Sequence, residues 1–164
     1  ASRRRATSAW DSTVARVVRE ATAPGTVAVI AAGEATASAL SAWQSVAPRE
    51  LLVPGSPVLR GFAGPAAVGA AIAGPAGRIV CFASARQLLD SRDAVETAAR
   101  LALSILVLVV GERGGDAPGT LGDLAGGGAG ILLEAGDEAS LRVAIERALS
   151  GAGPALIDVR APTV

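Results

Sequence analysis

Three short, uninterrupted apolar runs limit the folds open to this chain. They are TVAVIA at Thr26–Ala31, IVCFA at Ile79–Ala83 and SILVLVV at Ser104–Val110. Short continuous runs of this kind are typical of strands that are covered on both faces. A strand buried on both sides needs helices above and below it, so these runs predict a sheet of parallel strands within an α/β fold.

Segments with helical periodicity alternate with these strands and with three weaker strand candidates. The weaker strands are expected at Glu50–Val53, Gly130–Leu133 and Ala155–Val159. The helices are expected from Asp11 or Ser12 to Ala21, at Ala35–Val46, Gly64–Ala73, from Ser91 or Asp93 to Leu101, at Leu121–Leu124, and at Glu138–Leu149 with Asp137 as its cap. In the third of these helices, Gly69, Ala70 and Ala71 should allow close approach of another helix or a ligand.

Six strands alternating with helices predict a doubly wound, mainly parallel six-stranded sheet with helices on both faces. Such sheets bind ligands beyond the carboxyl ends of their strands, at the point where the strand order reverses. The candidate ligand loops therefore follow Ala31, Val53, Ala83 and Val110. We expect one domain over residues 8–164, preceded by a flexible terminus at residues 1–7.

Composition excludes several classes of function. Acidic and basic residues balance at 15 each, so no excess of positive charge favours a nucleic-acid partner. The absence of histidine excludes histidine-based metal sites and Ser-His-Asp triads. No apolar run reaches the ~18–20 residues that span a bilayer. The single cysteine, Cys81, lies in a predicted strand and is interpreted as a core residue rather than a nucleophile. A lone cysteine suits a cytoplasmic location.

The middle of the chain carries a set of small motifs in a fixed order. Gly61-Phe62 precedes a helix with the pattern Pro65-Ala66-Ala67 and Gly69-Ala70, and the strand Ile79–Ala83 follows. Near the end of the sequence lies the segment GPALIDV, at Gly153–Val159. This order resembles the C-terminal, diphosphate-side cofactor domain of thiamine-diphosphate enzymes in the acetolactate synthase, pyruvate decarboxylase and sulfopyruvate decarboxylase superfamily. The resemblance extends over nearly the whole chain.

The resemblance implies where the cofactor would bind. In that family a GDG turn ends the middle strand, and its aspartate holds a divalent cation together with an asparagine that follows the next strand. The cation in turn holds the diphosphate. Position by position, the cofactor-binding candidates are Arg60, Gly61, Phe62, Ser84, Ala85, Arg86, Gly111 and Glu112.

Several of these positions depart from the family pattern: Ser84-Ala85-Arg86 stand in the place of GDG, and Arg60 stands where the family usually has an apolar residue. Ala85 stands in the place of the metal-binding aspartate, and Gly111-Glu112 stand in the place of the asparagine pair. Alanine offers no ligand and the chain contains no asparagine, so no metal ligand and no catalytic residue are assigned. Thiamine diphosphate is therefore the possible cofactor, and binding of Mg²⁺ together with it is doubtful.

Three interpretations of the altered site remain open. In the first interpretation, the domain has lost metal-dependent cofactor binding and serves as a structural or regulatory partner. Alternatively, Arg86 or Arg60 contacts the diphosphate directly, since the guanidinium fork suits phosphate oxygens, and Glu112 still holds a cation. In the third, the likeness is one of fold alone and the ligand is another nucleotide or acyl compound.

The resemblance also implies a function and a partner. Enzymes of this family divide the cofactor between two domains, and this chain corresponds to the diphosphate side only. The expected function is the cofactor-side subunit of a two-component thiamine-diphosphate-dependent 2-oxo-acid decarboxylase or carboligase. It would form a hetero-oligomer with a separate pyrimidine-side subunit. The alternative is a non-catalytic subunit of the same fold that stabilises or regulates a partner enzyme.

Overall fold

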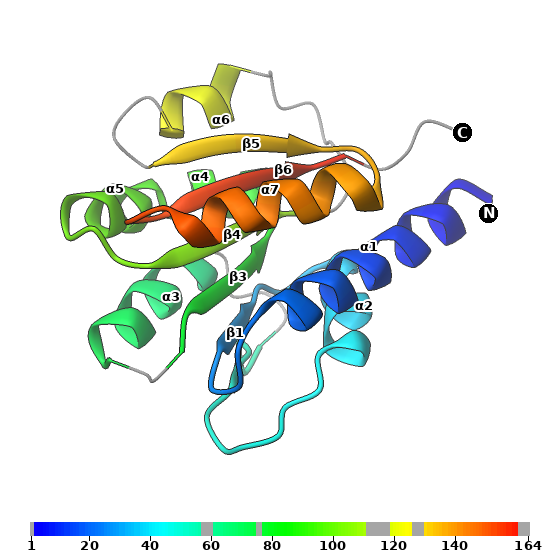
Figure 1. The fold of residues 1–164 in the computed structure, drawn as a ribbon, viewed down its shortest axis with the longest axis horizontal. Helices are drawn as coiled ribbons and strands as arrows, with labels where there is room; N and C mark the ends of the chain where they lie inside the picture. Colours follow the sequence, from blue (N-terminus) through cyan, green and yellow to red (C-terminus); the bar gives the residue numbers. More distant parts are fainter. Residues whose placement is uncertain (1, 57–60, 75–76, 111–118, 126–129, 161–164) are drawn as a thin grey trace.

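The computed structural model describes residues 2–56, 61–74, 77–110, 119–125 and 130–160 (Figure 1). The strands are β1 (Val27–Ile30), β2 (Leu51–Leu52), β3 (Ile79–Ala83), β4 (Ile105–Val109), β5 (Ile131–Ala135) and β6 (Ala155–Val159). The helices are α1 (Ser2–Ala21), α2 (Glu34–Ala42), α3 (Ala63–Ile72), α4 (Ala85–Leu89), α5 (Arg92–Arg100), α6 (Gly119–Leu124) and α7 (Glu138–Ser150).

The strands form one sheet in the order β2-β1-β3-β4-β6-β5, and every neighbouring pair is parallel. The predicted doubly wound α/β architecture is therefore confirmed. The central strands β1, β3 and β4 are buried at every position, as their uninterrupted apolar runs indicated.

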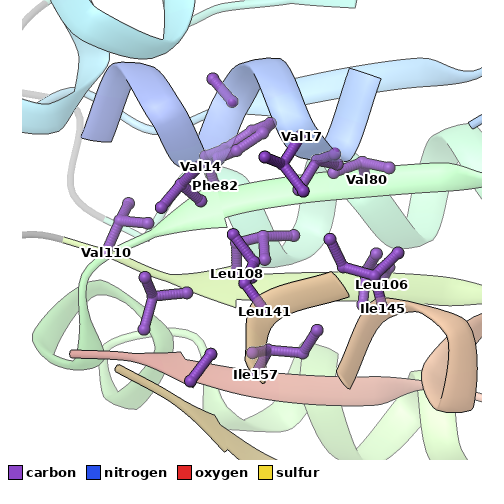
Figure 2. Packing of buried hydrophobic residues seen from close by; sticks show 14 of the residues in the cluster. Val14, Val17, Val80, Phe82, Leu106, Leu108, Val110, Leu141, Ile145 and Ile157 are labelled. Carbon is purple, nitrogen blue, oxygen red and sulfur yellow. The ribbon is translucent and has the colours of Figure 1, made fainter. Parts of the chain in front are cut away.

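Alternating residues along each strand feed two separate hydrophobic cores. Val80 and Phe82 point to the side covered by α1, α2 and α7, whereas Ile79 and Cys81 point to the side covered by α3, α4 and α5. Figure 2 shows the first core, in which α1 and α7 lay their apolar faces on β3, β4 and β6. Its labelled members are Val14, Val17, Val80, Phe82, Leu106, Leu108, Val110, Leu141, Ile145 and Ile157.

Cys81 belongs to the second core, as interpreted from the sequence. Its side chain is buried, and burial raises the pKa of its thiol to about 12 because the thiolate would lose its hydration. The thiol therefore stays protonated and packs as a small apolar group.

Two helix ends and one whole helix stand out among the differences from the prediction. Helix α1 begins at Ser2 instead of at Asp11 or Ser12, because the preceding residues contain neither glycine nor proline to stop it. Helix α2 ends at Ala42 instead of Val46, and Trp43 turns into extended backbone to fill the core. The short helix α4 was not predicted at all.

A buried carboxylate fastens the loops at the amino end of β1 and β2. Glu50 is 4% exposed and accepts backbone N–H groups from Gly25 at 3.1 Å, Val46 at 2.7 Å and Ala47 at 3.2 Å. The N–H of Val46, followed by those of Ala47 and Gly25, lowers the pKa of this carboxyl. Glu50 thus ties the α1–β1 turn to the loop that enters β2.

An exposed ionic cluster links α1 to α7. Arg16 bonds Glu20 at 2.7 Å and Glu138 at 3.1 Å, and Arg142 bonds Glu138 at 2.8 Å and Glu20 at 3.0 Å. At the start of α7, Asp137 caps the helix as predicted, with its carboxylate accepting the Ser140 N–H at 2.7 Å. Within the described ranges, no helix is both long enough and apolar enough to cross a membrane.

Candidate ligand crevice at the strand switch point

The strand order reverses between β1 and β3. From β1 the chain moves outward to β2 on one side, then returns to place β3 on the other side. The two strands run in register, with Ile30 beside Phe82 at their carboxyl ends. The turn after β1, residues 31–33, and the turn after β3, residues 84–86, therefore flank the crevice in which doubly wound sheets bind their ligands.

The turn after β3 is closed by its own side chains. Ser84 caps α4: its Oγ accepts the Gln87 N–H at 3.3 Å, and its own N–H donates to Gln87 Oε1 at 2.9 Å. This reciprocal pair is a capping box, and the spacing Ser-x-x-Gln is the sequence signal that could have revealed α4.

Gln87 also reaches the turn after β1. Its Nε2 donates a short hydrogen bond to the carbonyl oxygen of Ala32, in the turn after β1. One side-chain amide therefore joins the two turns at the switch point. Gln87 was not among the residues predicted from the sequence, because the family pattern marks cofactor-binding positions and not a bond between the two turns.

The position of the expected metal-binding aspartate carries no ligand. Ala85 is the first residue of α4 and is partly buried, and Arg86 beside it is exposed. Within the described residues, no group of three histidine, cysteine, aspartate or glutamate side chains is placed to hold a metal ion. The turn thus presents one methyl group and one guanidinium where the family pattern has a carboxylate.

The Gly61-Phe62 turn lies against the far end of α4. Gly61 has a φ of +65°, which favours glycine, and a Cβ there would stand 3.4 Å from the carbonyl oxygen of Asp90. Asp90 follows the last residue of α4, and Phe62 packs on the second core. The structure therefore brings Gly61-Phe62 and Ser84–Arg86 to the two ends of the same short helix. Arg60, Gly111 and Glu112 lie outside the described residues.

Comparison with known proteins identifies the family. Residues 31–116, more than half of the chain, match the family described as thiamine pyrophosphate enzyme, C-terminal TPP binding domain. This chain belongs to that family, whose cofactor is thiamine diphosphate and whose domain forms the C-terminal part of thiamine-diphosphate enzymes. The resemblance seen in the sequence is therefore confirmed.

Solved structures share the fold at low sequence identity. The chain is similar to the thiamine diphosphate-dependent 4-hydroxybenzoylformate decarboxylase of Rhodococcus jostii RHA1, with a TM-score of 0.79 and 21% identity over 94% of this chain and 33% of that one. It is also similar to benzoylformate decarboxylase from Polynucleobacter necessarius, with a TM-score of 0.76 and 20% identity over 91% of this chain and 32% of that one. The chain spans about a third of the length of either enzyme. No curated protein matches the sequence.

The described residues do not fit a diphosphate held through a metal ion at the β3 turn. A hard divalent cation needs oxygen ligands, and Ala85 supplies none. The Ser84 hydroxyl, the shortest polar side chain of the turn, is already bonded to Gln87. Any anion at this turn would meet the exposed Arg86 rather than a bound cation.

Proposed function

We propose that this domain is the cofactor side of a two-part thiamine-diphosphate enzyme acting on a 2-oxo acid, as a decarboxylase or a carboligase. The observation that carries the proposal is the switch point between β1 and β3 in a domain of this family. The pyrimidine side would come from another domain or subunit, giving a hetero-oligomer in the cytoplasm.

In this proposal, side chains of the altered turn bind the diphosphate directly. Arg86, two residues after Ser84, is exposed, and a guanidinium can form two parallel hydrogen bonds to phosphate oxygens. Arg60, Gly111 and Glu112 are the further candidates. Gly61, Phe62, Ser84 and Ala85 would shape the crevice rather than transfer protons.

The surface of α3 supports the need for a partner. All ten residues of this helix are apolar or glycine, yet only Ala63, Gly64 and Ala67 are buried. Ile72 at its end is 62% exposed, and Leu101 at the end of the neighbouring α5 is 50% exposed. A helix without polar residues is ordinarily covered on all sides, so this face suits an apolar surface of the pyrimidine-side partner.

A second candidate function follows from Ala85. A domain whose β3 turn has lost the metal ligand and bonds to itself would serve as a non-catalytic subunit that stabilises or regulates a partner enzyme. Thermal unfolding of the complex with and without thiamine diphosphate separates the two functions. A cofactor-dependent rise in melting temperature that Arg86→Ala removes supports the enzyme. A stable complex with no response to the cofactor supports the non-catalytic subunit.

A further inference from the structure

The side chain of Gln87 makes more hydrogen bonds than a capping role requires. Its Oε1 accepts from the Ser84 N–H at 2.9 Å and from the Ser84 hydroxyl at 3.1 Å. Its Nε2 donates to Ala32 O on the opposite turn. A capping box needs only the bonds to Ser84, so the bond to Ala32 serves a separate purpose.

The bond to Ala32 extends the connection between β1 and β3 beyond their backbone ladder. The Ala31 N–H donates to Phe82 O at 2.9 Å, at the carboxyl ends of these strands. Past this point the chain diverges, with α2 leaving one turn and α4 leaving the other. Gln87 holds the two turns together one residue beyond the ladder.

At neutral pH a side-chain amide of this length can form the connection, whereas an ionised carboxylate cannot. The group must accept from Ser84 and donate to Ala32 at the same time, and an amide has both capacities on one planar group. An ionised glutamate accepts but cannot donate, and a serine or alanine does not reach the opposite turn.

We propose that Gln87 is a positioning residue that sets the separation of the two switch-point turns through its own amide, with no divalent cation required. The crevice is then organised before any ligand arrives. The inference concerns the crevice of the proposed function but does not depend on thiamine diphosphate binding there.

Nuclear magnetic resonance of the unliganded chain tests the proposal. The signals to follow are hydrogen exchange of the Ser84 N–H and the carbonyl-carbon shift of Ala32. Gln87→Ala should speed Ser84 exchange about fivefold, the effect expected for one lost hydrogen bond, and should shift the Ala32 carbonyl signal. Gln44→Ala, at the only other glutamine and an exposed one, should change neither signal. Unchanged signals in Gln87→Ala would overturn the proposal.

Gln87→Glu supplies a readout that simple space filling would not move. At neutral pH its carboxylate cannot donate, so the Ala32 signal should resemble that of Gln87→Ala. As the pH falls through the pKa of the new carboxyl, the protonated group can donate again and the signal should return toward the wild-type position. The wild type should show no such change. A glutamate variant that matches the wild type at every pH would contradict the proposal.

Added Mg²⁺ completes the test in the wild-type chain. Millimolar Mg²⁺ should leave the Ala32 and Ser84 signals in place, because the amide already joins the turns. A Mg²⁺-dependent shift of both signals would show that a cation organises the crevice and would overturn the inference. Thiamine-diphosphate titrations are separate, so a failure of the proposed function would not be mistaken for a failure of this one.

Discussion

Gly64 of α3 lies so close to Ser91 that a Cβ atom on the glycine would stand 2.6 Å from the Ser91 Oγ. It would also stand 3.1 Å from the Cβ of Ala94. This contact holds the start of α3 against the junction of α4 and α5, where the Gly61-Phe62 turn also lies. The close approach of α3 is therefore made at Gly64 and not at Gly69, which has no atom within 4 Å of an added Cβ.

Alanine substitutions at these two glycines should have opposite effects on stability. Gly64→Ala should lower the free energy of unfolding by about 1–3 kcal/mol, because Ser91 and Ala94 must move to admit the methyl group. Gly69→Ala should raise it by about 0.5–1 kcal/mol, because alanine favours an exposed helix interior. Urea denaturation of both variants and the wild type measures these changes in the free energy of unfolding. Equal changes in the free energy of unfolding for the two variants would contradict the claim that α3 makes its close approach at Gly64.

Glu50 should make stability depend on acidic pH. Its folded-state pKa is lowered by the N–H groups of Val46, Ala47 and Gly25, so its contribution is present above its ordinary pKa near 4.5 and is lost as pH falls through the lowered value. Glu50→Gln should reduce the urea midpoint at pH 7 and flatten its decline in acid. Glu146→Gln, exposed on α7, is the control and should leave the profile unchanged. An acid profile that Glu50→Gln does not alter would refute the assignment.

Restoring a carboxylate at Ala85 tests whether this position corresponds to the family's metal ligand. Ala85→Asp should be tolerated, since an acidic residue at a helix start is favoured by the helix dipole. In the complex with the partner, adding Mg²⁺ should increase further the rise in melting temperature that thiamine diphosphate gives this variant, and should add nothing to the rise of the wild type. Ala139→Asp, also at a helix start but on α7, should show no such increase with Mg²⁺. If both aspartate variants respond alike, the carry-over from the family pattern is wrong.

The apolar face of α3 should be required for binding the pyrimidine-side partner. Ile72→Asp places a charge on this face and should weaken the complex at least about tenfold, because the charge would lose hydration on docking. Val143→Asp, at a residue 56% exposed on α7 across the sheet, should leave binding intact. Size-exclusion chromatography and a binding titration measure the difference. Equal binding by both variants would exclude α3 from the interface.

The sequence predicted the strands better than the crevice. The runs at Ile79–Ala83 and Ala155–Val159 matched β3 and β6. β3 is buried at every position, and a strand buried on both faces needs continuous apolar residues. Helix α4 was missed because it has only five residues, too few to show a period, although Ser84 and Gln87 carried a capping signal. The bond from Gln87 to Ala32 could not be predicted, since it joins residues 55 positions apart.

The substitution at Ala85 was visible in the sequence, but its structural consequence was not. A missing carboxylate could have left an open turn or a rearranged one. In the structure the turn keeps a helix start whose polar groups are paired by Ser84 and Gln87. The Ser-x-x-Gln spacing signals this pairing, whereas the added bond from Gln87 to Ala32 depends on where the fold places the turn after β1.

Calorimetric titration of thiamine diphosphate tests the central claim most directly. The domain should be titrated alone and then in complex with its pyrimidine-side partner, sought first among the products of adjacent genes, with and without Mg²⁺. The account predicts binding that requires the partner, persists without Mg²⁺ and is lost in Arg86→Ala. A stable complex that binds no thiamine diphosphate under any of these conditions would contradict the claim that this domain is the cofactor side of an enzyme.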